Sequence, residues 1–324
     1  MFSKEERIIV TGGRGTIGRR VVEKLRVAGH QVVSLDRSTG ETIDELASDV
    51  TRFEEVFQTF AEFKPTCVLH MASEVGRMVG EKRPARMLEV SIAGTMNVIQ
   101  LCLAHQSRLV YLSTSEVYGN LGKRVMEESI EETQELVPTN VYAWSKLFCE
   151  RLCRHYVQNY SLKAAIVRPF MVYGPGEFPN PYRSAMSNFI YRALTGQKLT
   201  VHRGTSRAWT FVDDFVNGLV AVAAKGRFDR CEAYNIGRDE SKPMEEVAAE
   251  IVKAAGASPD LIELVDPPAK FNSPIKYGSF KRAREVLGFE ATTSVKDGIA
   301  ATVAWQRSAV LPVTRARAMD APAT

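Results

Sequence analysis

Short apolar runs alternate with longer amphipathic segments through the first half of the chain. The apolar runs at residues 7–11, 31–36, 67–72, 108–113 and 163–168 predict β-strands. The amphipathic segments at residues 15–28, 53–63, 83–104 and 142–159 predict α-helices. Strands separated by helices of this length form βαβ units with right-handed crossovers. The pattern therefore predicts an α/β fold with a doubly wound parallel sheet, whose ligands bind beyond the carboxyl ends of the strands.

The second half of the chain has a different pattern. Residues 173–182, rich in Pro and Gly, predict a loop, and the predicted helices are residues 187–194, 244–255 and 281–287. Residues 210–225 predict a short strand and then a helix, and residues 233–236 predict another short strand. We expect the main domain to comprise residues 1–173 and 210–237, and a smaller C-terminal substrate lobe to comprise residues 174–209 and 238–310. Residues 311–324 are rich in Pro, Ala and Arg without periodicity and predict a disordered tail.

The composition is that of an ordinary soluble globular protein, with 45% hydrophobic and 25% charged residues. The net charge of +4 comes from scattered basic residues, without a Lys/Arg-rich stripe interleaved with aromatic residues. This distribution argues against a nucleic-acid-binding protein. A mildly positive charge does suit a protein that must hold a diphosphate.

The five cysteines form an odd, scattered set, which favours a reducing compartment over a disulfide framework. Cys149 and Cys153 share a helical face, but no His or Cys pair stands nearby in the sequence to complete a metal site, so we expect no metal. The first residues lack the apolar core of a signal peptide, and no run approaches 18 apolar residues. We therefore expect a cytoplasmic protein that is not bound to a membrane.

A glycine-rich turn follows the first predicted strand and opens the first predicted helix. Gly13, Gly15 and Gly18 fill the pattern G-x-G-x-x-G, and Gly12 adds another glycine inside the turn. Glycine permits the tight turn, lets a pyrophosphate approach the backbone and lets the helix pack close to the strand. The helix N-terminus then faces the phosphates with unpaired N–H groups. This is the fingerprint of the Rossmann dinucleotide-binding unit.

Asp36 ends the next predicted strand, 18 residues after Gly18. Its carboxylate would accept hydrogen bonds from the adenosine ribose and repel a 2′-phosphate, which favours NAD over NADP. Arg37 beside it weakens that preference. Asp49 and Val50 precede the next helix, where Asp49 is either a partner for the adenine amino group or an ordinary acid of the helix's first turn.

Tyr142 and Lys146 stand four residues apart, so on a helix they share one face and can point into one cleft. A phenol is a poor base at neutral pH. A cation one turn away would favour the phenolate and lower the pKa of Tyr142. Both residue types are common, so the pair alone has a chance interpretation, and the glycine turn and Asp36 make the chemical interpretation the better one.

Together these features resemble the extended short-chain dehydrogenase/reductase family, in its NAD-dependent epimerase/dehydratase group that acts on nucleotide sugars. The similarity extends from residue 7 to about residue 300. The matching motifs are TGGRGTIG at 11–18, HMAS at 70–73, STSEVYG at 113–119, YAWSK at 142–146, RPFMVYGP at 168–175, RAWTFVDD at 207–214 and YNIG at 234–237.

The resemblance implies a transient 4-keto sugar, formed when a tightly bound NAD takes a hydride from C4. Tyr142 would be the base, Lys146 would hold the nicotinamide ribose and lower the tyrosine pKa, and Thr114 would hydrogen-bond the reacting hydroxyl. The implied cofactor-binding residues are Gly12, Gly13, Gly15, Thr16, Ile17, Gly18, Asp36, Arg37, Asp49, Val50, Met71, Ala72, Tyr142, Lys146 and Pro169.

Ser115 and Glu116 bear on what happens to the ketone. The Thr-Ser-Glu run resembles the 4,6-dehydratases, in which the carboxylate removes the C5 proton that the ketone acidifies. It also resembles the UDP-glucuronate decarboxylases, and Ser115 replaces the Asp that many dehydratases use as the acid. Our first expectation is the 4,6-dehydratase type, followed by a 4-epimerase and then a uronate decarboxylase. The alternative is that Glu116 is a solvated loop carboxylate or a bond donor's partner with no chemical role. A non-catalytic NAD-sensing module is the rival from another class.

The expected substrate contacts lie in the second half of the chain. Arg207 matches the family arginine that grips the diphosphate, Asn188 is an expected polar contact, and Lys270 and Lys276 are candidate basic ligands for a phosphate or carboxylate. Met171 and Ser91 stand where the family usually has Asn, so substrate identity is where the resemblance is weakest. By family similarity the helices predicted at 83–104 and 142–159 would form a homodimer.

Overall fold

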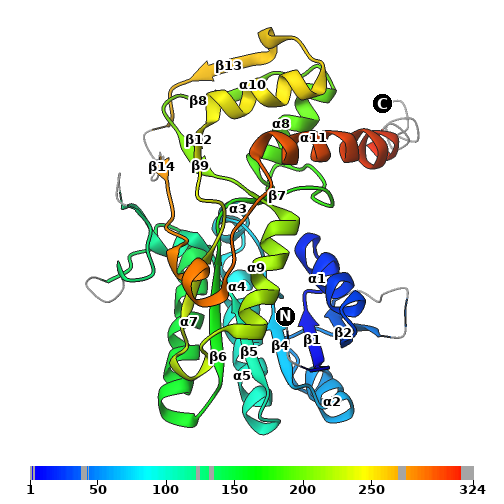
Figure 1. Ribbon diagram of the computed structural model, residues 1–324, viewed down its shortest axis with the longest axis vertical. Coiled ribbons are helices and arrows are strands. Elements are labelled where there is room, and N and C mark those ends of the chain that lie inside the picture. Colours follow the sequence, from blue (N-terminus) through cyan, green and yellow to red (C-terminus); the bar gives the residue numbers. More distant parts are fainter. Residues whose placement is uncertain are drawn as a thin grey trace.

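The computed structural model describes residues 2, 4–37, 42, 44–121, 125–130, 135–268 and 275–314. A seven-stranded parallel sheet occupies its lower half, with the strand order β11-β6-β5-β4-β1-β2-β3 (Figure 1). The strands are β1 (Arg7–Thr11), β2 (Gln31–Asp36), β3 (Glu45–Ala47), β4 (Cys67–His70), β5 (Arg108–Leu112), β6 (Ala164–Pro169) and β11 (Ala233–Ile236). This sheet confirms the predicted doubly wound α/β fold.

The strand order reverses between β1 and β4, which pair in parallel with Thr11 opposite His70. Chain connections on the two sides of this point run in opposite directions, which opens a crevice beyond the carboxyl ends of the two strands. The glycine turn after β1 and the segment after β4 therefore share one edge of the sheet.

Helices cover both faces of this sheet. Buried side chains of α1 (Thr16–Val27) and α9 (Val212–Lys225) pack with one face, in a core shared with the lobe above it. Those of α2 (Phe53–Phe63), α5 (Gly94–Ala104) and α7 (Val141–Tyr160) pack with the other. The sheet is thus buried on both sides, which is why its strands are almost wholly apolar.

The helix predicted at 83–104 is several elements. These are α4 (Pro84–Leu88), a π-helical turn η1 (Glu89–Ala93) and α5, preceded by α3 (Arg77–Lys82), which the sequence pattern did not indicate. The run Pro84–Ala104 is long and apolar enough to cross a membrane by length and composition alone. Half of it is buried inside the protein, as in the core helix of a globular domain.

A smaller lobe lies above the sheet (Figure 1). Its helices are α8 (Ala185–Leu194), α10 (Met244–Ala255) and α11 (Val295–Trp305). Two of its sheets have two strands each: β13 (Ile262–Val265) pairs with β8 (Leu199–His202), and β10 (Thr210–Phe211) pairs with β7 (Val172–Tyr173). In a three-stranded sheet, β9 (Ser206–Ala208) lies between β12 (Ser241–Pro243) and β14 (Ile275–Lys276). The division into two domains at the predicted boundaries stays a prediction.

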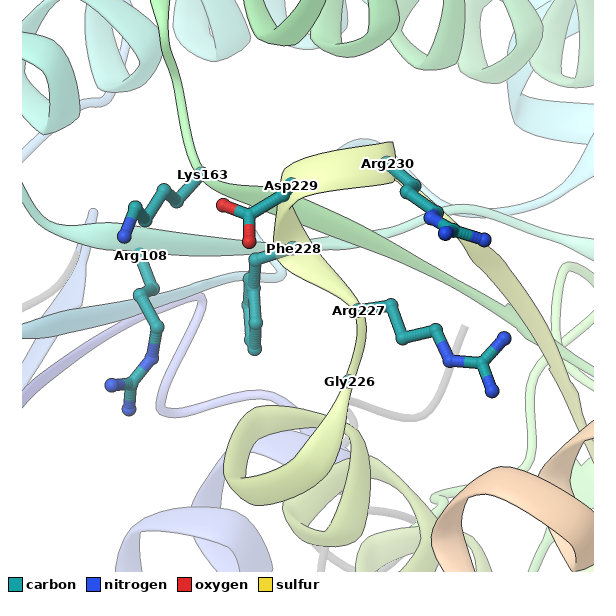
Figure 2. A pocket seen from close by; sticks show the side chains of 7 residues that line it. All are labelled: Arg108, Lys163, Gly226, Arg227, Phe228, Asp229 and Arg230. Carbon is teal, nitrogen blue, oxygen red and sulfur yellow. The ribbon is translucent and has the colours of Figure 1, made fainter.

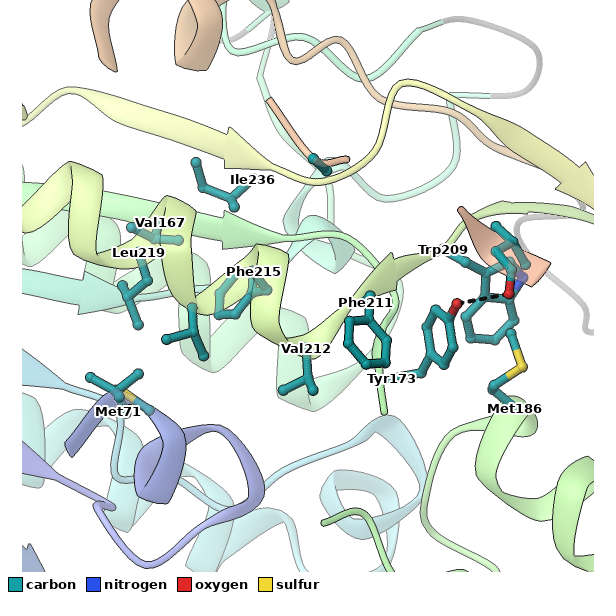
Figure 3. Packing of buried hydrophobic residues seen from close by; sticks show 14 of the residues in the cluster. Met71, Val167, Tyr173, Met186, Trp209, Phe211, Val212, Phe215, Leu219 and Ile236 are labelled. Carbon is teal, nitrogen blue, oxygen red and sulfur yellow. Dashed lines mark hydrogen bonds between the residues drawn. The ribbon is translucent and has the colours of Figure 1, made fainter. Parts of the chain in front are cut away.

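One core connects the lobe to the sheet. Phe211, just before α9, lies beside Tyr173, and the cluster continues to Val212 and Phe215 along α9 and to Met186 on α8 (Figure 3). The Tyr173 hydroxyl donates to the carbonyl of Val295 at 3.2 Å, which ties β7 to the start of α11. The two parts therefore share buried apolar surface near the carboxyl ends of the strands.

Two expectations for the C-terminal region need correction. Helix α11 was not predicted, although Val295, Ile299 and Val303 recur at helical spacing and are buried. Helical structure continues through η6 (Gln306–Val310) and residues 311–314, so these last four residues are ordered as a helix rather than as the start of a disordered tail. The rest of the predicted tail lies outside the described residues.

Candidate active site

A pocket of about 430 Å³ opens at the glycine turn, at the switch point of the sheet. Of the predicted cofactor residues it is lined by Gly12, Gly15, Thr16, Ile17, Gly18, Asp36, Arg37, Asp49, Val50, Met71 and Ala72. Gly13 instead packs beneath the turn, where an added Cβ would lie 2.1 Å from Ser34 Oγ. The pocket thus brings together residues from the ends of β1, β2 and β4.

The glycines allow close backbone packing. Gly12 has φ +70°, which favours glycine, and an added Cβ on Gly18 would lie 2.2 Å from the carbonyl oxygen of Gly12. Gly15 is the N-cap of α1, and no side chain among the described residues caps this helix. The first N–H groups of α1 are therefore open toward the pocket, as a pyrophosphate requires.

Asp36 lies at the mouth of this turn. Its carboxylate accepts hydrogen bonds from the backbone N–H groups of Arg14 (3.2 Å) and Arg37 (2.8 Å). The guanidinium of Arg37 lies 3.4 Å from Glu74, so its charge is already balanced by another carboxylate. Asp36 therefore presents the negative charge at this position, as expected for NAD.

The carboxylate of Asp49 stabilises the turn that contains it. One carboxylate oxygen accepts from the backbone N–H and hydroxyl of Thr51, and the other accepts from Arg86 at 3.1 Å. Burial acts to raise the pKa of Asp49, but these hydrogen bonds outweigh it and the pKa is lowered. The carboxylate lines the pocket with both oxygens engaged, which favours the turn interpretation.

A second pocket, of about 330 Å³, adjoins the first and shares Thr16, Ile17 and Met71 with it. All five predicted catalytic residues line it: Thr114, Ser115, Glu116, Tyr142 and Lys146, together with Pro169. Thr114 caps a 3-10 helix, η2 (Ser115–Tyr118), and its hydroxyl accepts from the backbone N–H of Glu116 at 3.2 Å. Asn140 caps α7 by accepting from the N–H of Ala143, which places Tyr142 in the first turn.

Tyr142 and Lys146 both point into this pocket, but their ionisation differs from the sequence-based expectation. Burial raises the pKa of Tyr142, and a hydrogen bond with Thr114 lowers it only in part. Burial also lowers the pKa of Lys146 to about 8, while its ammonium donates to the carbonyl of Leu112 at 2.8 Å. The net lowering of the tyrosine pKa that the sequence predicted is therefore not found, because removal from water outweighs the hydrogen bond with Thr114.

Glu116 is held from two sides. One oxygen is ion-paired with Lys276, and the other accepts from the amide of Asn140 at 3.2 Å. Burial, together with the positive charge of Arg77, lowers the pKa of Lys276 to about 7. Glu116 is therefore not a solvated loop carboxylate, and its role as a partner of bond donors without a chemical role stays the alternative.

Positive charges gather behind this pair. Lys276 on β14 lies opposite Arg207 on β9 in the register of the two strands. Arg207 is itself partly withdrawn from water, and burial and then Arg77 lower its pKa to about 10. Arg77, at the start of α3, lines the catalytic pocket. Three cations and one carboxylate thus suit an anionic ligand.

None of the predicted substrate residues that the structure describes (Asn188, Arg207 and Lys276) lines this pocket, and Lys276 is connected to it through Glu116. The amide of Asn188 donates to the carbonyls of Asn180, Arg183 and Ser184, so it holds the preceding loop together. It does not line the catalytic pocket. Lys270 falls outside the described residues.

Sequence reasoning missed Arg77, Glu177 and Arg183. Glu177 lines the catalytic pocket and accepts from the Ser184 hydroxyl at 2.5 Å, and burial raises its pKa. Arg183 lines both pockets. A signal existed for Arg77, because it follows the carboxyl end of β4, where ligands bind in this architecture. For the other two, only the fold of the 174–184 loop brings them over the cleft.

A further cavity, of about 520 Å³, lies elsewhere. It is formed at the opposite end of the sheet by Arg108 at the start of β5, Lys163 just before β6, and residues 226–230 (Figure 2). Arg108 is ion-paired with Glu6, and Arg227 with Glu232. The basic side chains point in different directions, so this cavity does not form a convergent site (Figure 2).

The first pocket fits NAD on three observations of this chain: the glycine turn without Cβ atoms, the uncapped start of α1, and the carboxylate of Asp36. It runs into the catalytic pocket, so a dinucleotide held there would extend toward Tyr142 and Lys146. The two pockets together have the form of a cofactor site joined to a reaction site.

Relatives of this chain carry out different reactions. It is 27% identical over 321 residues to a UDP-N-acetyl-alpha-D-glucosaminuronate decarboxylase of Bacillus cytotoxicus, covering 94% of this chain and 98% of the relative. It is 29% identical to a dTDP-glucose 4,6-dehydratase of Neisseria meningitidis, covering 92% of each chain. It is 28% identical to a UDP-glucose 4-epimerase of Mycolicibacterium smegmatis, covering 93% of this chain and 99% of the relative.

Solved structures agree with the fold. An epimerase from Methanothermobacter thermautotrophicus superposes with a TM-score of 0.85 at 25% identity, covering 96% of this chain and 95% of that one. The Thermus thermophilus UDP-glucose 4-epimerase in complex with NAD gives 0.81 at 28% identity, covering 94% and 100%. The model of the NAD dependent epimerase/dehydratase family matches residues 8–237, from β1 through β11. With the glycine turn, Asp36 and the Tyr142–Lys146 pair in one cleft, this chain belongs to the NAD-dependent epimerase/dehydratase family.

Proposed function

We propose that this protein oxidises C4 of a nucleotide-diphosphate sugar and then acts at C5, as a 4,6-dehydratase does. The observation that carries the proposal is the ion pair that Lys276 forms with Glu116, a residue that lines the pocket of Tyr142. A reaction confined to C4 has no use for this second acid–base pair. The ketone formed at C4 would acidify the C5 proton, which Glu116 could then remove.

Tyr142 is the base that takes the proton of the C4 hydroxyl. Thr114 hydrogen-bonds with the phenol and would hold the reacting hydroxyl in the same place. Lys146 supplies a positive charge one turn along the helix and is positioned by the carbonyl of Leu112. NAD held by the glycine turn and Asp36 would supply the acceptor for the C4 hydride and would be regenerated within the cycle.

The elimination needs an acid as well as a base. Glu116 takes the C5 proton, and the C6 hydroxyl leaves as water once it receives a proton. Ser115 cannot readily donate that proton, because an unperturbed hydroxyl is a very weak acid. Lys276, whose pKa is about 7 and which touches Glu116, is the better donor. The Glu116–Lys276 pair would thus supply both the base that takes the C5 proton and the acid that protonates the leaving hydroxyl.

A second outcome is favoured by the positive charges. Arg77, Arg207 and Lys276 would bind an anionic sugar as well as the diphosphate. With a uronate substrate, the C4 ketone makes the C5 carboxylate a β-keto acid, which loses carbon dioxide without protonation of a leaving hydroxyl. UDP-uronate decarboxylation is therefore the second candidate.

Simple 4-epimerisation needs only the Tyr142 centre, and a non-catalytic NAD sensor needs none of these acids and bases. Neither explains Glu116 and Lys276. Incubation with nucleotide sugars distinguishes both of them from the dehydratase and the decarboxylase.

The test is incubation of the protein with UDP-, GDP-, CDP- and dTDP-linked hexoses and hexuronates, followed by mass spectrometry. Loss of water supports the dehydratase, loss of carbon dioxide the decarboxylase, and unchanged mass with altered retention the epimerase. In deuterium oxide, a reaction at C5 also incorporates deuterium there, and Glu116→Gln should abolish that label. Conversion of no sugar while NAD stays bound would support the sensor.

We also propose a homodimer through α7 and α4, which contact one another. Trp144 and Phe148 lie one turn apart on α7 and are 45% and 50% exposed, and Leu88 on α4 is 39% exposed. Large apolar side chains gathered on adjoining helices are typical of an interface.

A further inference from the structure

A completely buried ion pair lies behind the catalytic residues. Glu150 on α7 and Arg168 on β6 are both 0% exposed, and they form two hydrogen bonds, of 2.5 Å (Nη2 to Oε2) and 2.9 Å (Nε to Oε1). Burial of an ion pair contributes little net stability compared with apolar residues of the same size. A role in stability alone therefore does not explain this pair.

Each partner reaches the segment that carries Thr114 and Glu116. Ser113, the residue before Thr114, donates its hydroxyl proton to Glu150 at 2.5 Å. Arg168 donates to the hydroxyl of Tyr118 at 3.0 Å, and its guanidinium lies over the Tyr118 ring at 4.9 Å. Tyr118 is the last residue of η2, the turn that includes Glu116. Glu150 and Arg168 therefore contact the residues on either side of the Thr114–Glu116 segment, and neither of them lines the pocket.

Glu150 also belongs to the helix of Tyr142 and Lys146. It follows Lys146 by four residues, so Tyr142, Lys146 and Glu150 occupy one face of α7. Burial acts to raise the pKa of Glu150, but Arg168 and Ser113 outweigh it and the pKa is lowered, so the carboxylate stays charged. Its negative charge opposes the effect of burial on Lys146.

The network continues to the C-terminal segment. The hydroxyl of Tyr118 donates to Asn235 at 2.8 Å, and the amide of Asn235 donates to the carbonyls of Met126 (2.9 Å) and Ser279 (3.2 Å). Ser279 lies three residues after Lys276. The elements that carry Tyr142, Glu116 and Lys276 are therefore joined by one chain of buried polar contacts.

We propose that Glu150 and Arg168 are positioning residues, which fix the Thr114–Glu116 turn against the Tyr142–Lys146 helix through Ser113 and Tyr118. They touch no reacting atom. They act on the Thr114–Glu116 turn through Ser113 and Tyr118. The inference rests on the proposed function, because it assigns the network to the same reaction.

The first test needs no substrate. Competitive acetylation with acetic anhydride over a pH series, read by peptide mass spectrometry, measures the pKa of Lys146 in the holoenzyme. Glu150→Gln should lower that pKa from about 8 toward about 7, because an adjacent negative charge is lost. Arg151→Gln, an exposed change on the same helix, should leave it unaltered. A Lys146 pKa near that of free lysine in Glu150→Gln would show that this variant is unfolded, and the Tyr118→Phe variant would then test the proposal.

The second variant is Tyr118→Phe, which removes only the hydroxyl between Arg168 and Asn235. We expect kcat to fall at least about tenfold with KM within about twofold, and the melting temperature and NAD binding to stay close to those of the wild type. Wild-type kcat in this variant would overturn the proposal. So would a wild-type Lys146 pKa in folded Glu150→Gln. If no nucleotide sugar is converted, the proposed function fails, while the Lys146 pKa still tests the network.

Discussion

Glu116, which lines the same pocket as Tyr142, forms an ion pair with Lys276 across 160 residues of chain. If the two act as one acid–base unit, their effects on turnover should not add. We expect Glu116→Gln and Lys276→Met each to lower kcat/KM by about 10²-fold or more, and the double variant to be no worse than the poorer single variant. Steady-state kinetics on the identified sugar measures this.

Lys281→Met is the matched control, because Lys281 is on the same C-terminal segment and is 72% exposed. It should leave kcat/KM unchanged. Strictly additive losses in the double variant would show that Glu116 and Lys276 act separately.

Tyr142→Phe removes the proposed base and keeps the ring. We expect kcat to fall about 10²- to 10⁴-fold, with NAD still bound, because the cofactor pocket is formed mainly by other residues. Kinetics and the ultraviolet spectrum of the purified protein test both statements. Activity close to that of the wild type would exclude the phenol as the base.

Asp36→Asn should weaken NAD binding roughly 10- to 100-fold, because a charge-assisted hydrogen bond to the ribose is lost. Binding of NADP should weaken less or improve, since the charge that repels its 2′-phosphate is removed. Calorimetric titration of the nucleotide-free protein gives both affinities. Glu23→Gln, an exposed change on α1, should alter neither, and an unchanged NADP/NAD ratio in Asp36→Asn would contradict the assigned role.

His70 should make the protein sensitive to acid. It is buried between Thr11 (2.8 Å) and Thr95 (3.1 Å), and burial, with a contribution from Lys146, lowers its pKa from 6.5 to about 3. Between these values the unfolded chain binds a proton that the folded protein does not. The stability from this group is therefore complete above pH 6.5 and is lost as the pH falls toward about 3.

We expect His70→Gln to lose less stability on acidification than the wild type, by about 2 kcal/mol between pH 6.5 and 5. Urea unfolding at the two pH values measures the difference. His155→Gln, an exposed histidine on α7, should show the wild-type pH dependence. Equal losses in His70→Gln and the wild type would mean that His70 titrates normally in the folded protein.

The apolar surface of α7 predicts the oligomeric state. Trp144→Glu combined with Phe148→Glu should shift sedimentation from dimer to monomer, because two charges would be buried in the proposed interface. Val27→Glu is the control, since Val27 is 84% exposed on α1, which packs on the other face of the sheet. A wild-type protein that sediments as a monomer would exclude this dimer.

Local chemistry determined much of this protein. The apolar runs at β1, β2 and β4 and the glycine turn from Gly12 to Gly18 follow from period, turn geometry and close packing, which are properties of neighbouring residues. The four-residue spacing of Tyr142 and Lys146 likewise fixed their common face. These features predicted the fold class, which the structure confirms, and the candidate cofactor residues before any tertiary contact was known.

Long-range contacts decided the rest. Lys276 meets Glu116 only because β14 pairs with β9, and Arg77 joins them from a short helix without a clear sequence pattern. The raised pKa of Tyr142 and the lowered pKa of Lys146 depend on burial, which no spacing in the sequence specifies. The sequence by itself therefore determined where the hydride-transfer centre lies. The tertiary structure decided which charges surround it, because desolvation and charge pairing are set by segments far apart in the chain.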